Sequence, residues 1–419
     1  MTERRVVIVG GGIIGLCCAW YARQAGLAVT LVERGAPGHD ACSLGNGGMV
    51  VPSHFEPLAA PGMAALALKS LFTPASPVRV DPRLDWRFLR WGLDFVRSAS
   101  ALHVQRSGPL LRDYALLSRH CYEQLAQLRG NDFGFTPAGM ISVANTAQGF
   151  EHECRSAQAA QRLNIDSRIL TVAQLRDLEP AMRFDVAGGV YFPLDAHLVP
   201  QRLLDHLTES LVAQGVRLMW STEALGWRST HSAVEALQTS AGDLSADEYV
   251  LAAGVWSRDA LQGLQLRLPV EAGKGYSLTV AQPPVLPTHC AILSEARIAV
   301  TPMGSSLRFA GTMQFAGHDL RIDPRRVRPM IKAIPAYLPD FQTTDFAAIQ
   351  PWAGLRPITP DGLPFLGRSE RYRNLIIATG HAMMGVSLAP ATGLIVSELL
   401  QRKNPSLPLT LLQPERFAA

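Results

Sequence analysis

The first 33 residues alternate between apolar runs and glycines in a pattern that predicts a strand, a helix and a second strand. The β-branched run at residues 5–9 ends at glycine, which is typical of a buried strand. Residues 13–25 predict a helix that Gly26 stops, and residues 28–32 form a second apolar run. Together they predict a βαβ unit with parallel strands and a right-handed crossover.

Further segments of the same kinds follow along the chain. Helices are expected at residues 85–99, 108–129, 203–214 and 388–400, and buried strands at 216–220, 249–253 and 375–379. Residues 35–62 are rich in Gly, Pro, Ser and Asn and predict a loop. Between residues 263 and 349 apolar and polar positions alternate, as at 276–280 and 297–301, which predicts mainly antiparallel sheet. The expected fold class is α/β, with a Rossmann-like nucleotide-binding domain and an α+β second domain.

Length and composition narrow the class of protein. A chain of 419 residues is long for a single core, so two domains are expected. The net charge is +4 and no run of five like charges occurs, which does not favour nucleic-acid binding. The six cysteines include no CxxC pair, so we expect no metal site and reduced thiols in a cytoplasmic setting. No apolar stretch reaches the ~18 residues of a membrane-spanning helix.

The glycines between the first strand and the first helix form a phosphate-binding motif. Residues 10–15 (GGGIIG) fit GxGxxG in the strand–helix context that this motif requires. Gly10 allows the tight turn, Gly12 lets the backbone approach a pyrophosphate, and Gly15 brings the helix close to the strand. The helix N-terminus, with Ile13 and Ile14, presents N–H groups and a positive dipole end to the phosphates.

A carboxylate follows the second strand. Glu33 lies 23 residues after Gly10, where an acidic side chain accepts hydrogen bonds from ribose hydroxyls and disfavours a 2′-phosphate. The alternative interpretation is that Glu33 merely ends the strand. With the whole βαβ unit in register, we expect a cofactor of the FAD or NAD type rather than NADP. The first unit by itself does not decide between FAD and NAD.

Five further blocks carry a family resemblance. They are residues 43–48 (SLGNGG), 188–200, 252–257 (AAGVWS), 352–362 (WAGLRPITPDG) and 379–393. With the N-terminal loop, and in this order, they resemble the D-amino-acid oxidase-like FAD oxidoreductases, which include glycine oxidase, sarcosine oxidase and bacterial D-amino-acid dehydrogenases. Residues 274–279 (KGYSLT) and 60–62 (APG) are most similar to the bacterial D-amino-acid dehydrogenases and D-hydroxyproline dehydrogenases.

The resemblance implies FAD and two interrupted domains, and the lack of a strong Cys or His signal for covalent attachment leads us to expect noncovalent FAD. The FAD-binding domain is expected to comprise residues 1–78, 148–262 and 350–419, and a substrate domain built on antiparallel sheet to comprise 79–147 and 263–349. The implied cofactor-contacting residues are Gly10, Gly12, Ile13, Ile14, Gly15, Glu33, Arg34, Ser43, Asn46, Gly47, Gly48, Gly254, Gly380, Met384, Gly385 and Val386. The glycine-lined loop that begins at Gly380 offers backbone donors, which would stabilise an anionic reduced flavin.

The activity that the resemblance implies is oxidation of a small D-amino acid, with D-proline or D-hydroxyproline as candidate substrates. A hydride passes from the substrate Cα to flavin N5, and the electrons pass on to a quinone or another acceptor. Two alternatives remain open. One is a glycine- or sarcosine-type oxidase that uses oxygen, and the other is an FAD subunit that works only within a larger electron-transfer complex.

Four residues are candidates for the substrate end of the site. The family pattern places Arg356 on the substrate carboxylate, since a guanidinium and a carboxylate form a planar bidentate pair; the alternative is an ion pair with Asp361. Tyr276 either closes over the substrate or packs in the core of the second domain. His381 either contacts the flavin or a substrate proton, or is a structural loop histidine. His54 follows the glycine-rich block and is expected near the flavin ring.

One position departs from the family pattern. Where related oxidases have an arginine shortly after the equivalent of His381, this chain has Met383 and Met384. A second cationic contact to the carboxylate is therefore expected to be missing. These side chains either form an apolar wall suited to a small aliphatic or cyclic substrate, or serve in packing alone.

The aromatic segment at residues 86–96 has two interpretations. Its apolar side chains, flanked by Arg87, Arg90 and Arg97, fit a helix that lies on a membrane surface. They equally fit a helix buried against the rest of the chain, and burial is favoured. Dehydrogenases of the resembling type pass electrons to a respiratory quinone, which keeps the membrane interpretation in play. The expected location is the cytoplasm, with the inner face of the membrane as the alternative.

Overall fold

The computed structural model describes residues 3–38, 41–63, 65, 76–128 and 130–417. Its N-terminal unit confirms the predicted βαβ pattern, with β1 (Arg5–Val9), α1 (Ile13–Gln24) and β2 (Ala28–Val32). β1 pairs in parallel with β2 and with β13 (Glu248–Leu251). A six-stranded sheet in the order β19-β20-β13-β1-β2-β9 is completed by β9 (Arg217–Met219), β19 (Phe365–Arg368) and β20 (Leu375–Thr379). This is the expected Rossmann-like layer.

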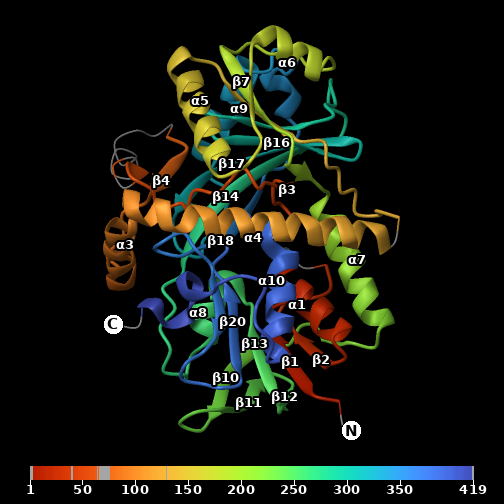
Figure 1. Cartoon of the computed structure of the whole chain (residues 1–419), viewed down its shortest axis with the longest axis vertical. Coiled ribbons are helices and arrows are strands. Elements are labelled where there is room, and N and C mark those ends of the chain that lie inside the picture. The colour runs from red at the N-terminus through yellow and green to blue at the C-terminus, as the bar shows by residue number, and fades with distance from the viewer. Residues whose placement is uncertain (1–2, 39–40, 64, 66–75, 129, 418–419) are drawn as a thin grey trace.

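A second, nine-stranded sheet forms the other half of the molecule (Figure 1). Its order is β18-β14-β17-β16-β15-β5-β7-β6, with β4 paired to β17. The strands are β4 (Val78–Val80), β5 (Met140–Ala144), β6 (Arg168–Leu170), β7 (Gly188–Phe192), β14 (Glu271–Val280), β15 (Cys290–Leu293), β16 (Ile298–Met303), β17 (Ser306–Phe315) and β18 (Trp352–Ile358). Pairing is antiparallel except at β5–β15 and β4–β17, which confirms the mainly antiparallel sheet expected from residues 263–349.

The strand pairing divides the chain differently from the predicted domain boundaries. β6 and β7 were expected in the FAD-binding domain as part of residues 148–262, and β18 as part of 350–419. All three belong to the nine-stranded sheet instead. β7 pairs with β5, and β18 pairs with β14, over five and seven residue pairs respectively. The sequence of a strand does not show which sheet it joins, because strands of both sheets have the same alternating pattern.

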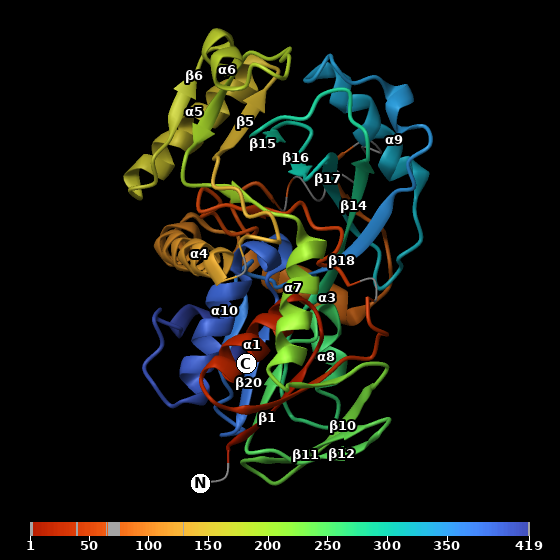
Figure 2. The ribbon, with the colours of Figure 1, turned by 90° about the vertical axis from the view of Figure 1, so that its right-hand side faces the viewer.

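Smaller sheets and helices complete the fold. A three-stranded antiparallel sheet of β10 (Ala224–Ser229), β11 (Val234–Thr239) and β12 (Gly242–Leu244) lies at the end remote from the large sheet (Figure 2). β3 (Met49–Val50) pairs with β8 (Ala196–His197). The remaining helices are α3 (Trp86–Ser98), α5 (Ala147–Arg162), α6 (Val172–Leu178), α7 (Pro200–Ala213), α8 (Ser257–Ala260), α9 (Pro324–Ala333) and α10 (Gly385–Leu400).

A long helix, α4 (Ala101–Leu128), crosses between the two sheets (Figure 1). It begins well before the predicted residue 108 and continues through Pro109. The Ser100 hydroxyl accepts a hydrogen bond from the backbone N–H of His103 at 3.2 Å, as a capping residue does. The predicted boundary was wrong because Gly108-Pro109 resembles a helix start, whereas the capping serine lies eight residues earlier.

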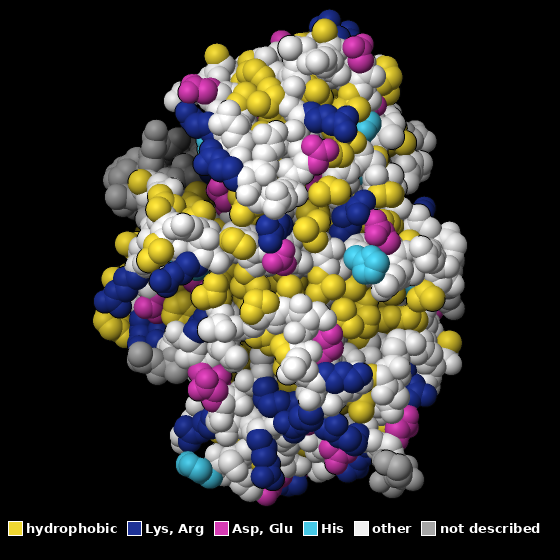
Figure 3. Space-filling view, in the orientation of Figure 1, with side chains coloured by type: hydrophobic (Ala, Val, Ile, Leu, Met, Phe, Trp, Pro, Cys, Tyr) yellow, Lys and Arg dark blue, Asp and Glu magenta, His cyan; other side chains and the backbone are white. Residues whose placement is uncertain are grey.

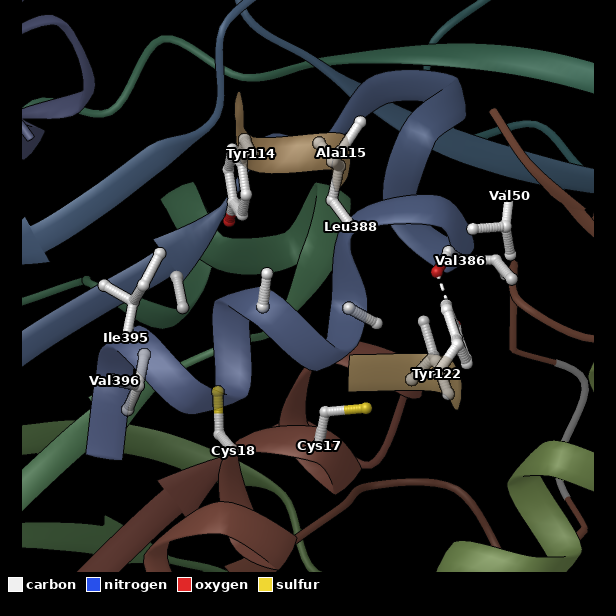
Figure 4. Packing of buried hydrophobic residues seen from close by; sticks show 14 of the residues in the cluster. Cys17, Cys18, Val50, Tyr114, Ala115, Tyr122, Val386, Leu388, Ile395 and Val396 are labelled. Atoms are coloured by element: carbon white, nitrogen blue, oxygen red, sulfur yellow. Dashed lines mark hydrogen bonds between the residues drawn. The ribbon is translucent and has the colours of Figure 1, made fainter. Parts of the chain in front are cut away.

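Helix α10 is the central helix of the core and packs against α1 and α4 (Figure 4). Of the described chain, residues 382–400 are long and apolar enough to cross a membrane, but 67% of that segment is buried within the protein. Pro390 lies inside the helix and has no N–H to donate to the Val386 carbonyl. The Tyr122 hydroxyl of α4 donates to that carbonyl at 2.6 Å instead. A side chain thus satisfies a buried backbone group that the helix leaves without its usual partner.

Replacement of Tyr122 by phenylalanine is expected to lower the free energy of unfolding by about 1–3 kcal/mol, because the buried Val386 carbonyl loses its donor. The loss is expected to shrink in a Pro390→Ala background, where the new backbone N–H at 390 reaches the same carbonyl. Urea unfolding of the four variants of this double-mutant cycle measures both effects. Equal losses in the two backgrounds would contradict the assignment.

Candidate active site

One large cavity, of about 1010 Å³, lies between the two sheets. On one side it is lined at the carboxyl ends of β1, β2, β13 and β20, by Val9, Val32, Ala252 and Thr379. Strands of the large sheet, including β14, β17 and β18, line the other side. Open α/β sheets bind ligands beyond the carboxyl ends of their strands, so this cavity is where a cofactor is expected.

The phosphate loop has the geometry that its glycines require. Gly10 has φ +114°, and a Cβ there would lie 2.4 Å from the Ala252 carbonyl oxygen. A Cβ at Gly15 would lie 1.8 Å from the Gly10 carbonyl oxygen. At Gly12, the N-cap of α1, the nearest atom to a Cβ would be Ser43 Oγ at 3.8 Å. The first two glycines therefore allow close backbone packing, and Gly12 leaves open space where a pyrophosphate would approach the helix N-terminus.

Two backbone N–H groups, from different loops, hold the Glu33 carboxylate in place. Its carboxylate accepts hydrogen bonds from the backbone N–H of Gly11 at 2.6 Å and of Gly35 at 2.8 Å. The next residue, Arg34, places its guanidinium 3.9 Å from the centre of the Trp256 ring. Glu33 and Arg34 both line the cavity. Glu33 is therefore more than a strand end, because its carboxylate shapes the loop in which a ribose would lie.

A partly buried arginine of the large sheet binds the glycine-rich loop at residues 43–48. Arg308 of β17 donates to the carbonyls of Leu44 at 2.7 Å and Asn46 at 2.8 Å. The Asn46 side chain in turn accepts from the Gly48 N–H at 2.8 Å. Burial lowers the pKa of Arg308 to about 10, which leaves it charged near neutral pH. Sequence reasoning missed Arg308, because an arginine in an alternating strand has the pattern of a solvent-facing residue.

Other positions of that loop lie against neighbouring elements. Ser43 Oγ accepts from the Ile13 N–H at 3.2 Å, at the start of α1. A Cβ at Gly48, which has φ +68°, would lie 2.4 Å from the Leu198 carbonyl oxygen. Gly47 lies opposite the side chains of Ala299 and Ala310. Ser43, Asn46 and Gly47 line the cavity, as the resemblance implied. Gly48 does not line the cavity and packs against Leu198 instead.

The loop after β20 forms another wall. Gly380 has φ +81°, and a Cβ there would lie 2.5 Å from the Thr359 methyl carbon. Residues Gly380 to Val386 and Gly254 line the cavity. Met383 is 43% exposed, while Met384 packs against the core. The two methionines thus place apolar surface at the cavity, as expected.

His381 in this loop has one ring nitrogen, Nδ1, without a hydrogen-bond partner among the described residues. Its Nε2 lies 3.0 Å from the Thr392 hydroxyl oxygen, which also lies 2.8 Å from the Leu388 carbonyl and 2.6 Å from the Tyr114 hydroxyl. With the Thr392 proton on the Leu388 carbonyl, His381 Nε2 is the donor and Nδ1 carries the lone pair. Nδ1 is buried and has no hydrogen-bond partner among the described residues. Burial lowers the pKa of His381 to about 3, so the ring is neutral and Nδ1 is available to accept from a bound cofactor.

Arg356 lies in β18 with its guanidinium at the cavity. It donates to the Thr312 carbonyl at 2.6 Å and lies over Gly275, where a Cβ would be 2.2 Å from the guanidinium carbon. The alternative ion pair with Asp361 is wrong, because Asp361 is paired with Arg416 at 2.7 and 3.0 Å. Burial lowers the pKa of Arg356, but a guanidinium stays protonated. One edge of this cation therefore faces the cavity.

A β-bulge creates the contact between Arg356 and Thr312. The pairing of β14 with β17 shifts register opposite residues 311–314, and Thr312 has φ +59°. This is a strained conformation for a β-branched residue. It is accommodated here because it directs the Thr312 carbonyl to the guanidinium. No sequence pattern predicted the bulge, since the residue in the left-handed conformation is not glycine.

Tyr276 and His54 also line the cavity, in different ways. Tyr276 is 1% exposed, and its hydroxyl donates to Gln314 at 2.8 Å, which favours the interpretation as a core tyrosine. His54 Nδ1 lies 3.1 Å from the Ser53 hydroxyl. Arg297, from the turn between β15 and β16, lines the same cavity, in addition to Arg34 and Arg356.

These observations test whether FAD fits the cavity. The crowded glycines, the open N-terminus of α1, the Glu33 carboxylate and the unused His381 acceptor match a pyrophosphate, a ribose and a polar ring system. When bound, FAD supplies the hydride acceptor. No group of three or more residues within the described ranges has the arrangement of a metal site.

Comparison with known proteins agrees with the geometry. The family described as "DAO: FAD dependent oxidoreductase" matches residues 5–399. The "D-amino acid dehydrogenase" of Paramagnetospirillum magneticum is 33% identical over 428 aligned residues, which cover 99% of each chain. That of Vibrio vulnificus is 30% identical and covers 96% of this chain and 98% of the relative.

Solved structures show the same fold. Glycine oxidase from Geobacillus kaustophilus superposes with a TM-score of 0.79 at 25% identity, over 99% of both chains. L-proline dehydrogenase from P. horikoshii superposes with a TM-score of 0.75 at 18% identity, over 99% of this chain and 98% of that one. With residues 5–399 matched and the cofactor cavity formed as described, the chain belongs to the DAO family of FAD-dependent oxidoreductases.

Proposed function

We propose that this FAD-dependent enzyme oxidises small D-amino acids, of the D-proline or D-hydroxyproline type, and passes the electrons to a quinone or a similar acceptor. The observation that carries the proposal is the Arg356 guanidinium, a partly buried cation at the cavity whose only protein hydrogen bond recorded among the described residues is to one carbonyl. The "D-amino acid dehydrogenase" relatives at 28–33% identity support the D-configuration.

Arg356 would bind the substrate carboxylate. Its second edge presents parallel N–H groups, which pair with the two carboxylate oxygens and fix the orientation of Cα. Thr312 supports the geometry, because its carbonyl holds the guanidinium from behind. Met383 and Met384 would contact the substrate side chain, and an apolar wall favours a small aliphatic or ring-shaped group over a charged one.

The proposed function is tested by anaerobic mixing of the FAD-loaded protein with a panel of D- and L-amino acids, both prolines, the hydroxyprolines, glycine and sarcosine. D-proline-like compounds are expected to bleach the bound flavin, which an artificial dye then reoxidises faster than oxygen does. Faster reoxidation by oxygen would establish an oxidase instead. Absence of bleaching by every amino acid would refute the proposed substrate class, and activity restored by material from the source would indicate a missing partner subunit.

Replacement of Arg356 by methionine is expected to raise the KM for the best amino acid about tenfold to a hundredfold, because the carboxylate loses a charge-assisted bidentate partner. Steady-state kinetics with the dye as acceptor measures the change. Arg328→Met is a matched control, since Arg328 is exposed on α9 and lies outside the cavity. An unchanged KM in Arg356→Met would remove Arg356 from the substrate site.

We further propose that α3 binds an anionic membrane surface, which would bring the enzyme to a membrane-held quinone. One side of the helix is buried, where Trp91 and Phe95 pack with Phe315. On the other side Trp86, Leu89, Leu93 and Val96 are 49–77% exposed. Arginines flank this surface, and Figure 3 shows hydrophobic and basic side chains together over α3 at the left of the view. A helix that presents an exposed apolar stripe beside cations fits the interface of an anionic bilayer.

The Leu89→Glu, Leu93→Glu double variant is expected to lose at least about tenfold in affinity for vesicles that contain phosphatidylglycerol, because two glutamates oppose both insertion and charge attraction. Vesicle co-sedimentation measures binding, and the rate with a soluble dye checks that the site is intact. The control is the double variant Ile169→Glu, Leu286→Glu, which places the same charges at exposed apolar residues elsewhere. Equal binding by wild type and both variants would contradict the proposal.

A further inference from the structure

Three side chains form a hydrogen-bonded chain from the cavity into the protein interior. His54 lines the cavity, and its Nδ1 lies 3.1 Å from the Ser53 hydroxyl oxygen. That oxygen lies 2.5 Å from Asp195 Oδ2, and the Ser53 backbone N–H donates to Asp195 Oδ1 at 3.0 Å. Asp195 has no exposed surface. A buried carboxyl group is thus connected to the cavity through one hydroxyl and one imidazole.

The fold holds this chain in place. β3 ends at Val50 and β8 begins at Ala196, and these two residues are paired in the antiparallel ladder. The pairing brings Ser53, just after β3, beside Asp195, just before β8. Sequence reasoning named His54 but missed Asp195, since nothing in the sequence connects positions 142 residues apart.

The surroundings of Asp195 bring the pKa of its carboxyl group close to neutral pH. Burial raises the pKa of Asp195 to about 7, and the two hydrogen bonds from Ser53 and the charge of Arg119 on α4 oppose that rise. The other titratable groups that interact with it are the Tyr191 phenol of β7 and the buried Cys290 thiol of β15, whose own pKa values are raised. Asp195 can therefore gain or lose a proton near neutral pH.

The protonation state of Asp195 determines which nitrogen of His54 carries the proton. Burial lowers the pKa of His54 to about 4, so the ring is neutral. When Asp195 is ionised, the Ser53 hydroxyl donates to it and must accept from His54 Nδ1–H, which leaves a lone pair on Nε2. When Asp195 is protonated, the two hydrogen bonds of the Ser53 hydroxyl reverse, and His54 Nε2 carries the proton. No described residue bonds Nε2.

We propose that Asp195 takes up the proton that the substrate ammonium group must lose before hydride transfer, and that Ser53 and His54 conduct it. The inference rests on the proposed oxidation of an amino acid. An ammonium nitrogen has no lone pair with which to form the imine, so it must give up a proton first. A neutral amine is the form from which the Cα hydride leaves.

The transfer balances in charge and in protons. The ammonium gives a proton to His54 Nε2, His54 gives its Nδ1 proton to Ser53 Oγ, and Ser53 gives its hydroxyl proton to Asp195. The products are a neutral amine, a neutral His54 in its other tautomer, an unchanged Ser53 and a protonated Asp195. One positive and one negative charge disappear together, and the negative charge is that of the fully buried Asp195, where ionisation is costly.

The test measures the rate of flavin reduction against pH in the FAD-loaded protein, from about pH 6 to about pH 10, with the amino acid that bleaches the flavin fastest. The wild-type rate is expected to rise through a pH of about 7, as Asp195 ionises. Ser53→Ala, which cuts the chain with little change in volume, is expected to reduce the rate about a hundredfold near neutral pH. The two rates are expected to approach each other at alkaline pH, where a growing share of the substrate amine is already neutral.

Asp195→Asn is expected to give the same pH profile as Ser53→Ala, and agreement of the two variants guards against a folding defect in either. Ser167→Ala is the control, because it deletes a buried hydroxyl that donates to the Ala157 carbonyl at 3.1 Å and lies outside the cavity. A wild-type profile in both Ser53→Ala and Asp195→Asn would overturn the relay while the proposed function stands. Absence of bleaching in wild type even at alkaline pH would overturn the proposed function, and the relay with it.

Discussion

The site depends on how closely α1 packs against its neighbours. On one side Gly15 lies against the Gly10 carbonyl, and on the other Gly393 of α10 lies against the Cys17 carbonyl, at distances that no Cβ permits. This contact sets the position of the helix N-terminus, and with it the direction in which the first backbone N–H groups point. A shift of α1 by the width of a methyl group would move the phosphate site away from the cavity. The packing of two helices and the binding of the cofactor are therefore one constraint.

Two partly buried arginines show how the large sheet serves the cavity. Arg308 donates to two backbone carbonyls of the glycine-rich loop and to the Thr279 hydroxyl, so it holds that loop against the large sheet. Arg356 has a single carbonyl partner recorded among the described residues, and its pairing capacity is directed to the cavity. The same residue type thus has a structural role in one strand and a proposed binding role in another. The difference lies in the number of acceptors that the fold places around each guanidinium.

The histidines and the acid near the cavity share one physical feature. His381 is buried and His54 is partly buried, and desolvation lowers both pKa values, so both rings are neutral near pH 7 and each offers a lone pair. Asp195 is buried with only partial compensation, which brings its pKa to about 7. An apolar environment thus provides neutral acceptors at the cavity wall and a titratable acid behind it. Such a combination suits a reaction that removes both a hydride and a proton from the substrate.

The sequence by itself determined the local elements and the cofactor motif. β1, β2 and β20 have the predicted bounds, because short runs rich in β-branched residues carry their own signal. The phosphate loop and the family blocks located the cofactor residues for the same reason, since each is a contiguous pattern.

Only the tertiary structure decided the rest. Positions far apart in the chain come together in four places. They are the pairing of β6, β7 and β18 in the large sheet, the hydrogen bonds of Arg308 and Arg356, the bulge at Thr312, and the hydrogen-bonded chain from His54 to Asp195. Pairings of this kind leave no periodicity to detect, because a strand edge, a buried cation and a buried acid look the same in sequence whichever partner they meet. Their chemistry is set by burial and by neighbours, and both arise only when the two sheets close around the cavity.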